Sequence, residues 1–117
     1  MKKVIIADDS FFQRKTLQDI LRDLGHESEA VSSGEELLDT LNETHDCIFL
    51  DLLMGGMSGI EVLKELRARE SKTPVVVITA DIQKARREEC MELGATAFMN
   101  KVVNKDELVS ILNNIFN

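Results

Sequence analysis

Apolar residues along the chain alternate between two patterns, short continuous runs and stripes at helical spacing. Short apolar runs are typical of strands that are buried on both faces of a sheet. We expect strands at residues 4–7, 27–31, 47–50, 75–78 and 97–99. The segments between and after them, most with leucine or isoleucine every three or four residues, predict helices around residues 17–24, 37–41, 60–66, 83–93 and 108–115.

Strands that alternate with helices in this way predict an α/β fold with a parallel sheet and helices on both faces. Residues 4–7, 47–50 and 75–78 are nearly all apolar, so we expect these strands in the centre. Residues 27–31 are too polar for the centre and belong at one edge, and the mixed strand 97–99 fits the other edge. This selects the strand order 2-1-3-4-5 of the flavodoxin-like, doubly wound fold, with five strands flanked by five helices.

Length and composition fit one domain, residues 1–117. No apolar run approaches the length of a membrane span, and the first residues do not resemble a signal peptide, so we expect a cytoplasmic protein without membrane insertion. The net charge of −7, without a basic stripe, argues against direct binding of nucleic acid. Cys47 and Cys90 lie in apolar segments, and we expect both to be buried.

Polar side chains lie at the ends of four of the five expected strands. Asp8 and Asp9 follow the first strand, Asp51 the third, Thr79 the fourth and Lys101 the last. The carboxyl ends of parallel strands lie at the same edge of a sheet, and ligands of such folds bind there near the point where the strand order reverses. We therefore expect these five side chains to converge on one small patch.

Three carboxylates in one crevice repel one another and need a cation nearby, and Lys101 supplies only one positive charge. Oxygen ligands without cysteine or histidine favour a hard divalent ion, and a site with room for water and phosphate suits Mg²⁺ better than Ca²⁺. A carboxylate, a metal site, a hydroxyl and an ammonium together indicate phosphoryl transfer. One aspartate would attack as the nucleophile, the others would hold the metal, and Thr79 and Lys101 would donate to the phosphoryl oxygens.

Taken one at a time, these residues have simpler explanations. Asp8 and Asp9 precede a helix that they could cap, and Asp51 begins a loop. Thr79 could be the last β-branched residue of its strand, and Lys101 could be a solvated charge at the sheet edge. Their joint placement at the same end of four strands favours the phosphoryl-transfer site.

The two histidines fail the same positional test. His26 and His45 precede the second and third strands, so they belong at the opposite end of the sheet. We expect surface or boundary residues without a catalytic or metal-binding role.

The spaced set of residues resembles the receiver domains of two-component response regulators over essentially the whole chain. The resemblance rests on Asp8-Asp9, on the segment 51–59 (Asp-Leu-Leu-Met-Gly-Gly-Met-Ser-Gly), on Thr79-Ala80, and on Leu93-Gly94-Ala95 leading to Phe98 and Lys101. With no room for an output domain after the last helix, the chain looks like a stand-alone receiver. Such a protein is a signalling switch that catalyses only its own phosphorylation and dephosphorylation.

By this resemblance, Asp51 is the phosphoacceptor and receives its phosphoryl group from the phosphohistidine of a histidine kinase. The resemblance implies Mg²⁺ as the cofactor, held by Asp8, Asp9, Asp51 and the backbone carbonyl of Leu53.

The resemblance implies further roles for three residues. Thr79 is the switch hydroxyl, Lys101 is the phosphate-binding lysine, and both belong with Asp51 to the catalytic set. Phe98 occupies the aromatic switch position of the last strand. Phosphorylation would reshape the face formed by the fourth helix, the fifth strand and the fifth helix, as a shift between two packings that already exist.

The implied partners are proteins. Besides the kinase, they include a downstream target, such as a flagellar motor switch if the chain is a chemotaxis-type regulator or a phosphotransfer protein if it is a phosphorelay intermediate, and a phosphatase. Lys84, Arg86 and Arg87 on the fourth helix are candidate contacts for an acidic partner surface; the alternative is an ordinary solvated helix face.

The chain departs from the family pattern at three positions. Gly55 replaces a usual proline, which predicts a more mobile loop after Asp51. Val102 replaces the proline that follows the lysine in a cis peptide bond; because a cis bond before valine costs about 3–4 kcal/mol, we expect a trans bond and an altered turn. Phe98 lacks the hydroxyl of a tyrosine. These departures keep open a degenerate receiver that acts as a phosphorylation-independent interaction module.

A different class of function, a small hydrolase or a flavin carrier on the same fold, fits less well. Haloacid-dehalogenase-like enzymes have Asp-x-Asp after the first strand, where this chain has adjacent aspartates. A flavodoxin has a phosphate loop there rich in serine, threonine and glycine, whereas Asp8-Asp9-Ser10 would repel a flavin phosphate.

Overall fold

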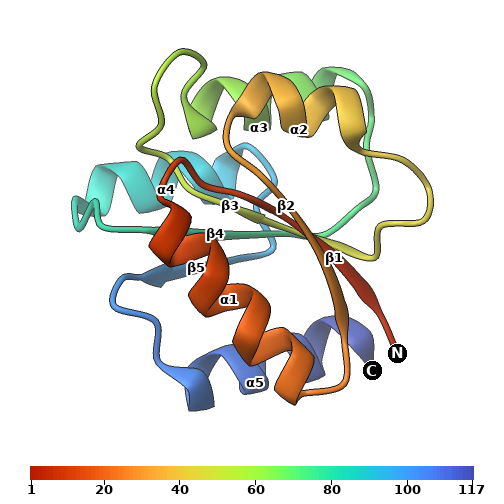
Figure 1. Ribbon diagram of the computed structural model, residues 1–117. Helices are drawn as coiled ribbons and strands as arrows, with labels where there is room; N and C mark the ends of the chain where they lie inside the picture. Colours follow the sequence, from red (N-terminus) through yellow and green to blue (C-terminus); the bar gives the residue numbers. More distant parts are fainter.

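A computed structural model describes all residues, 1–117, and places a five-stranded sheet between two layers of helices (Figure 1). In chain order the elements are β1 (Lys3–Ala7), α1 (Phe11–Asp23), β2 (Glu27–Val31), α2 (Gly34–Thr40), β3 (Cys47–Leu50), α3 (Gly59–Ala68), β4 (Val75–Thr79), α4 (Lys84–Glu92), β5 (Ala97–Asn100) and α5 (Lys105–Phe116). All strand pairs are parallel, and the order β2-β1-β3-β4-β5 confirms the expected topology.

The burial of each strand follows its composition. Every residue of β3 and β4 is buried, and so is every residue of β1 except the first, Lys3, which is half-buried. In β2, by contrast, only Val31 is buried, which suits an edge strand. The apolar runs therefore form the centre of the sheet, where both faces are covered.

Alternate residues of the central strands point to opposite faces of the sheet and build two separate cores. Ile5, Ile48 and Val77 belong to the core beneath α2, α3 and α4, whereas Ile6 and Phe49 belong to the core beneath α1 and α5. Figure 1 shows the same division of the helices between the two faces. Packing from both sides holds the sheet in place, so the ends of its strands form a fixed platform.

The sheet has two rims. The carboxyl rim consists of the segments that directly follow the strands, and the amino rim consists of the segments that precede them. Gly25 and Gly94, in the turns that lead from α1 to β2 and from α4 to β5, have φ angles of 85° and 99°. This left-handed conformation is open to glycine at little cost and ends both helices sharply at the amino rim.

Both cysteines are buried free thiols, as expected. Burial raises the pKa of Cys47 to about 12 and that of Cys90 to about 11. Both side chains therefore act as apolar core residues and not as reactive thiolates. None of the five helices combines the length and the apolar character that crossing a bilayer requires.

The peptide bond between Lys101 and Val102 is cis, so the expectation of a trans bond is wrong. The expectation rested on the intrinsic preference of an isolated peptide bond. In the folded chain, Lys101 has further contacts: its backbone N–H donates to the Thr79 carbonyl, and its ammonium binds two carboxylates.

Candidate functional site

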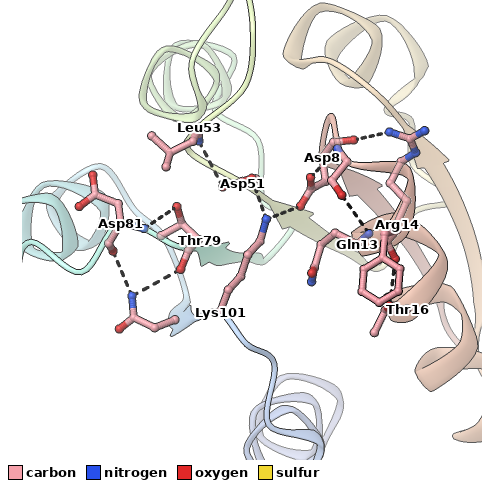
Figure 2. A network of polar contacts seen from close by, with 12 residues as sticks. Asp8, Gln13, Arg14, Thr16, Asp51, Leu53, Thr79, Asp81 and Lys101 are labelled. Atoms are coloured by element: carbon pink, nitrogen blue, oxygen red, sulfur yellow. Dashed lines mark hydrogen bonds and ion pairs between the residues drawn. The ribbon is translucent and has the colours of Figure 1, made fainter.

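Four strands bring their polar end residues together at the carboxyl rim (Figure 2). Ala7 of β1 lies opposite Leu50 of β3, so Asp8 and Asp51 follow neighbouring positions in the sheet. The backbone N–H of Asp51 continues the ladder by donating to the Ala7 carbonyl at 3.0 Å. Parallel register alone therefore places the two carboxylates side by side.

Lys101 reaches these carboxylates from the end of the edge strand β5. Its Nζ lies 2.9 Å from Oδ2 of Asp8 and 2.9 Å from Oδ2 of Asp51. Burial lowers the pKa of Lys101, but the hydrogen bonds and charges of the two aspartates outweigh it, so the net shift is upward. The ammonium is therefore charged at neutral pH, and the alternative of a solvated edge lysine is wrong.

The helix-capping alternative for Asp8 and Asp9 is also wrong, because Ser10 caps α1. The Ser10 hydroxyl accepts a hydrogen bond from the backbone N–H of Gln13 at 3.2 Å. Oδ1 of Asp8 instead accepts from the Ser10 backbone N–H at 2.9 Å. Ser10 thus provides the acceptor for the free N–H at the start of α1, and neither aspartate side chain is needed as the helix cap. Asp8 is buried and Asp9 is exposed.

Carboxylate oxygens of Asp8, Asp9 and Asp51 lie within 4.8 Å of one another. Two of the three carboxylates, those of Asp8 and Asp51, share the Lys101 ammonium, which leaves an excess of negative charge in a partly buried crevice. The donors are all oxygens, the type that hard divalent cations prefer, and one side of the cluster faces solvent at Asp9. These residues fit a divalent metal ion, and the acidic cluster could hold one.

The loop after β3 holds the Asp51 side chain. Oδ1 of Asp51 accepts a hydrogen bond from the backbone N–H of Leu53 at 3.2 Å. Gly59 packs so closely under this loop that a Cβ atom there would collide with the Asp51 carbonyl. Ser58 and Glu61 form a reciprocal capping box that starts α3 at this point. Oδ1 of Asp51 is therefore bonded to the loop, and Oδ2 is bonded to Lys101.

Thr79, at the end of β4, is completely buried, and its hydroxyl lies in a network that sequence reasoning did not find. Oγ1 of Thr79 accepts a hydrogen bond from the Asp81 backbone N–H at 3.3 Å. Nδ2 of Asn100 donates to the carbonyls of Asp81, at 3.0 Å, and Thr79, at 3.4 Å. The signal was present in the sequence, because Asn100 is a polar residue in the last strand, directly before Lys101.

Phe98 is buried, with 7% of its surface exposed, and packs in the core beneath α4. The guanidinium of Arg87 lies over the ring, 5.6 Å from its centroid. The other two cations of α4 pair with acids. Lys84 lies 3.9 Å from Glu88, and Arg86 contacts both Asp81 and Glu89.

The histidines lie at the amino rim, as expected, but His45 is not a surface residue. It is 4% exposed, its Nε2 lies 2.9 Å from Oε1 of Glu29, and its Nδ1 accepts from the Asn42 backbone N–H at 3.1 Å. Both ring nitrogens therefore have partners within the fold. The sequence pattern did not predict this burial, because the partner, Glu29, lies in β2, far from His45 in the sequence.

Known proteins with similar sequences point to one family. A sequence profile of the response regulator receiver domain matches residues 4–113. The sensory/regulatory protein RpfC of Xanthomonas campestris pv. campestris is 36% identical over 115 residues, which cover 94% of this chain and 16% of RpfC. The transcriptional regulatory protein CpxR homolog of Haemophilus influenzae is 34% identical over 110 residues, which cover 94% of this chain and 48% of that protein. The chain thus spans less than half the length of these two relatives.

Solved structures agree with the sequence match. The chemotaxis protein CheY4 of Vibrio cholerae superposes with a TM-score of 0.87 at 30% identity and covers 98% of each chain. The receiver domain of the Francisella response regulator 1452 superposes with a TM-score of 0.89 at 27% identity, covering 99% of this chain and 97% of the other. Because the profile and both structures match over nearly the whole sequence, this chain belongs to the family of response regulator receiver domains, the signalling modules of two-component systems.

Proposed function

We propose that this chain is a phosphorylation-dependent switch that accepts a phosphoryl group on Asp51 from the phosphohistidine of a histidine kinase. The observation that carries the proposal is the pairing of Asp51 with Asp8 through one ammonium, that of Lys101, at 2.9 Å from each carboxylate. A buried carboxylate with an acidic neighbour and a bound cation has the groups that phosphoryl transfer requires. The chain catalyses this transfer to itself and the later hydrolysis, and acts on no other substrate.

In the proposed reaction, a carboxylate oxygen of Asp51 attacks the phosphorus of the phosphohistidine. A P–O bond forms as the P–N bond breaks, and the electron pair of the broken bond stays on the ring nitrogen. With the other ring nitrogen protonated, the donor leaves as a neutral imidazole. The product is an aspartyl phosphate, and Lys101 remains close enough to donate to its phosphoryl oxygens.

The metal of this proposal is Mg²⁺, held by Asp8, Asp9, Asp51 and the backbone carbonyl of Leu53. The support is the cluster of three carboxylates described above, whose oxygens lie within 4.8 Å of one another. When bound, Mg²⁺ neutralises the charge that gathers on the phosphoryl oxygens during transfer.

Thr79 and Phe98 connect the phosphoryl group to the output face in this proposal. The Thr79 hydroxyl accepts a hydrogen bond, so its own proton is available for a phosphoryl oxygen. Thr79 of β4 pairs with Asn100 of β5, and Phe98 lies two residues before Asn100 in β5. A shift of Thr79 therefore reaches Phe98, Arg87 and the face formed by α4, β5 and α5, through which the switch signals to a protein target.

Exposed apolar side chains support a protein partner at the phosphorylation site itself. Seven large apolar side chains are exposed, and five of them follow β1, β3, β4 or β5 at the carboxyl rim: Phe11, Phe12, Leu53, Ile82 and Val102. Exposed apolar side chains in the segments that contain the charged site suit a kinase domain that buries the reacting groups while it docks. A cytoplasmic location is part of the same proposal, because both cysteines are free thiols.

The experiment combines a phosphodonor with a structural readout. With Mg²⁺ and acetyl phosphate, the chain should form an acid-stable, hydroxylamine-labile adduct on Asp51, located by mass spectrometry of the peptides. Beryllofluoride, which mimics the phosphoryl group, should shift NMR resonances from Asp51 through Thr79 to Phe98 and α4. Both responses should disappear in Asp51→Asn and persist in Asp39→Asn, which changes an exposed aspartate of α2 in the same way.

If wild type and Asp51→Asn respond alike, the acceptor assignment is wrong. If neither responds although both are folded, the chain is an interaction module that works without phosphorylation.

A further inference from the structure

Gln13 contains the only buried side-chain nitrogen or oxygen of the chain that lacks a hydrogen-bond partner, its Nε2. The residue lies in the first turn of α1, where its backbone N–H is bonded to the Ser10 cap. Its side chain points from the helix toward Lys101 (Figure 2). Buried donors without an acceptor are rare in folded proteins, so this nitrogen needs an explanation.

The two carboxylates that Lys101 binds already accept hydrogen bonds from other donors, and none comes from Gln13. Oδ1 of Asp8 is taken by the Ser10 N–H and Oδ1 of Asp51 by the Leu53 N–H. The Oδ2 atoms of both aspartates are taken by the Lys101 ammonium, at 2.9 Å each. The resting site therefore directs several donors at two carboxylates, and the Gln13 donor is left over.

A phosphoryl group on Asp51 would change this balance, because it brings three strong acceptor oxygens to the carboxylate that Lys101 contacts, and the Gln13 side chain points toward Lys101. We infer that Gln13 is a phosphoryl-binding residue, whose Nε2–H donates to an oxygen of the phosphoryl group on Asp51. The inference rests on the proposed function, because it needs phosphorylation at Asp51. A bond that forms only with the phosphoryl group present stabilises the phosphorylated state over the resting state.

A purely structural role for Gln13 predicts different behaviour. Replacing an unsatisfied buried amide by an apolar side chain of similar shape is neutral or stabilising for the fold. Gln13→Leu should therefore unfold at the same or a higher temperature than wild type. The inference adds a second effect in the opposite direction, a weaker affinity for a phosphoryl mimic.

The test is a beryllofluoride titration at saturating Mg²⁺, followed by NMR on ¹⁵N-labelled protein. In wild type, the side-chain amide signal of Gln13, assigned by its absence in Gln13→Leu, should shift when the mimic binds. The affinity of Gln13→Leu should fall about tenfold or more, as expected for one hydrogen bond to a charged acceptor. Mg²⁺ affinity and thermal stability should not fall. Gln18→Leu, the same change farther along α1, should bind like wild type.

Gln13→Glu provides a second variant of the same shape. It places a carboxylate where the inference needs a donor, so beryllofluoride should bind more weakly than to Gln13→Leu. Affinities of both Gln13 variants equal to that of wild type, with an unmoved amide signal, would overturn the inference and leave the proposed function intact. Absence of any response at Asp51 in wild type would overturn both.

Discussion

Both rims of the sheet contain buried polar side chains, but they satisfy them in different ways. At the amino rim, His45 has one partner for each ring nitrogen, and Oδ2 of Asp46 accepts from the Lys3 backbone N–H at 2.8 Å. At the carboxyl rim, two buried carboxylates share the single ammonium of Lys101, with a third carboxylate close by. The amino rim is thus complete as it stands, whereas the carboxyl rim has more charge than its own residues neutralise.

The comparison separates polar groups that stabilise the fold from polar groups that serve the site. A buried polar group with its own partner adds to stability, and nothing further needs to bind there. A surplus of like charge is unfavourable for the free protein and favours whatever neutralises it, such as a cation. Variants at the carboxyl rim should therefore change phosphorylation, whereas variants at the amino rim should change stability alone.

The largest effect should come from Lys101→Met, which removes the only ammonium of the carboxyl rim. Phosphorylation by acetyl phosphate should slow about a hundredfold, the usual cost of losing one donor to a charged transition state. The metal-free variant should also be less stable, because its carboxylates repel one another without a counterion. Mg²⁺ should then raise the melting temperature of the variant more than that of wild type, because the ion takes over that role.

Lys105→Met is the matched control, since Lys105 is exposed at the start of α5. It should become phosphorylated and respond to Mg²⁺ like wild type.

In wild type, the raised pKa of Lys101 means that its contribution to stability is complete below the ordinary lysine pKa of about 10.5 and is lost as the pH rises through the higher folded value. An equal response of Lys101→Met and wild type to Mg²⁺ would contradict the surplus-charge description of this rim.

The sequence was sufficient to predict the topology and the meeting of Asp8, Asp9, Asp51 and Lys101 at one rim of the sheet. Apolar runs identified the central strands, polar Glu27–Val31 identified an edge, and parallel strands have their carboxyl ends on one side. Those relations depend only on local pattern and strand direction. They place Asp8, Asp51 and Lys101 together without any knowledge of side-chain packing.

The missed features all depend on contacts between distant segments. Asn100 bonds across to the loop after β4, and His45 is buried because Glu29 lies beside it on another strand. The unpartnered amide of Gln13 is visible only when the surrounding atoms are placed. The cis bond after Lys101 likewise could not be predicted from the preference of an isolated peptide bond.

A moderate effect should come from Asn100→Val at the carboxyl rim. The Asn100 amide holds the carbonyls of Thr79 and Asp81 in their resting positions. Without these bonds the loop after β4 is freer to follow Thr79 toward a phosphoryl group, so beryllofluoride should bind about two- to fivefold more tightly. An NMR titration like the one for Gln13 measures this affinity.

Thr96→Val makes a parallel change at the amino end of the same strand. Thr96 Oγ1 accepts from the Val75 backbone N–H at 3.2 Å, which also joins β5 to β4. This variant should lose some stability in urea but keep the beryllofluoride affinity of wild type. Tighter binding in both variants would mean that general loosening of β5, and not the Asn100 bonds, controls the switch.

The smallest effect should come from Glu29→Gln at the amino rim. The hydrogen bond from His45 holds the pKa of Glu29 below its usual value, with a smaller contribution from Lys3 that works against a slight effect of burial. A lowered folded pKa means that the carboxylate stabilises the fold at neutral pH. That contribution disappears as the pH falls below the usual value of 4.5 and through the folded value. Since the side chain is 41% exposed, the loss in Glu29→Gln at pH 7 should stay below about 1 kcal/mol.

Urea unfolding of wild type and Glu29→Gln at pH 7 and at pH 3 measures this difference, which should shrink at the lower pH. Acetyl phosphate should label both proteins at the same rate at pH 7. Slower labelling of the variant would show that the two rims are coupled through the sheet, because Ile5 of β1, whose strand ends at Asp8, pairs with Glu29 in the register. Equal labelling with a pH-dependent loss of stability would locate the role of the amino rim in folding alone.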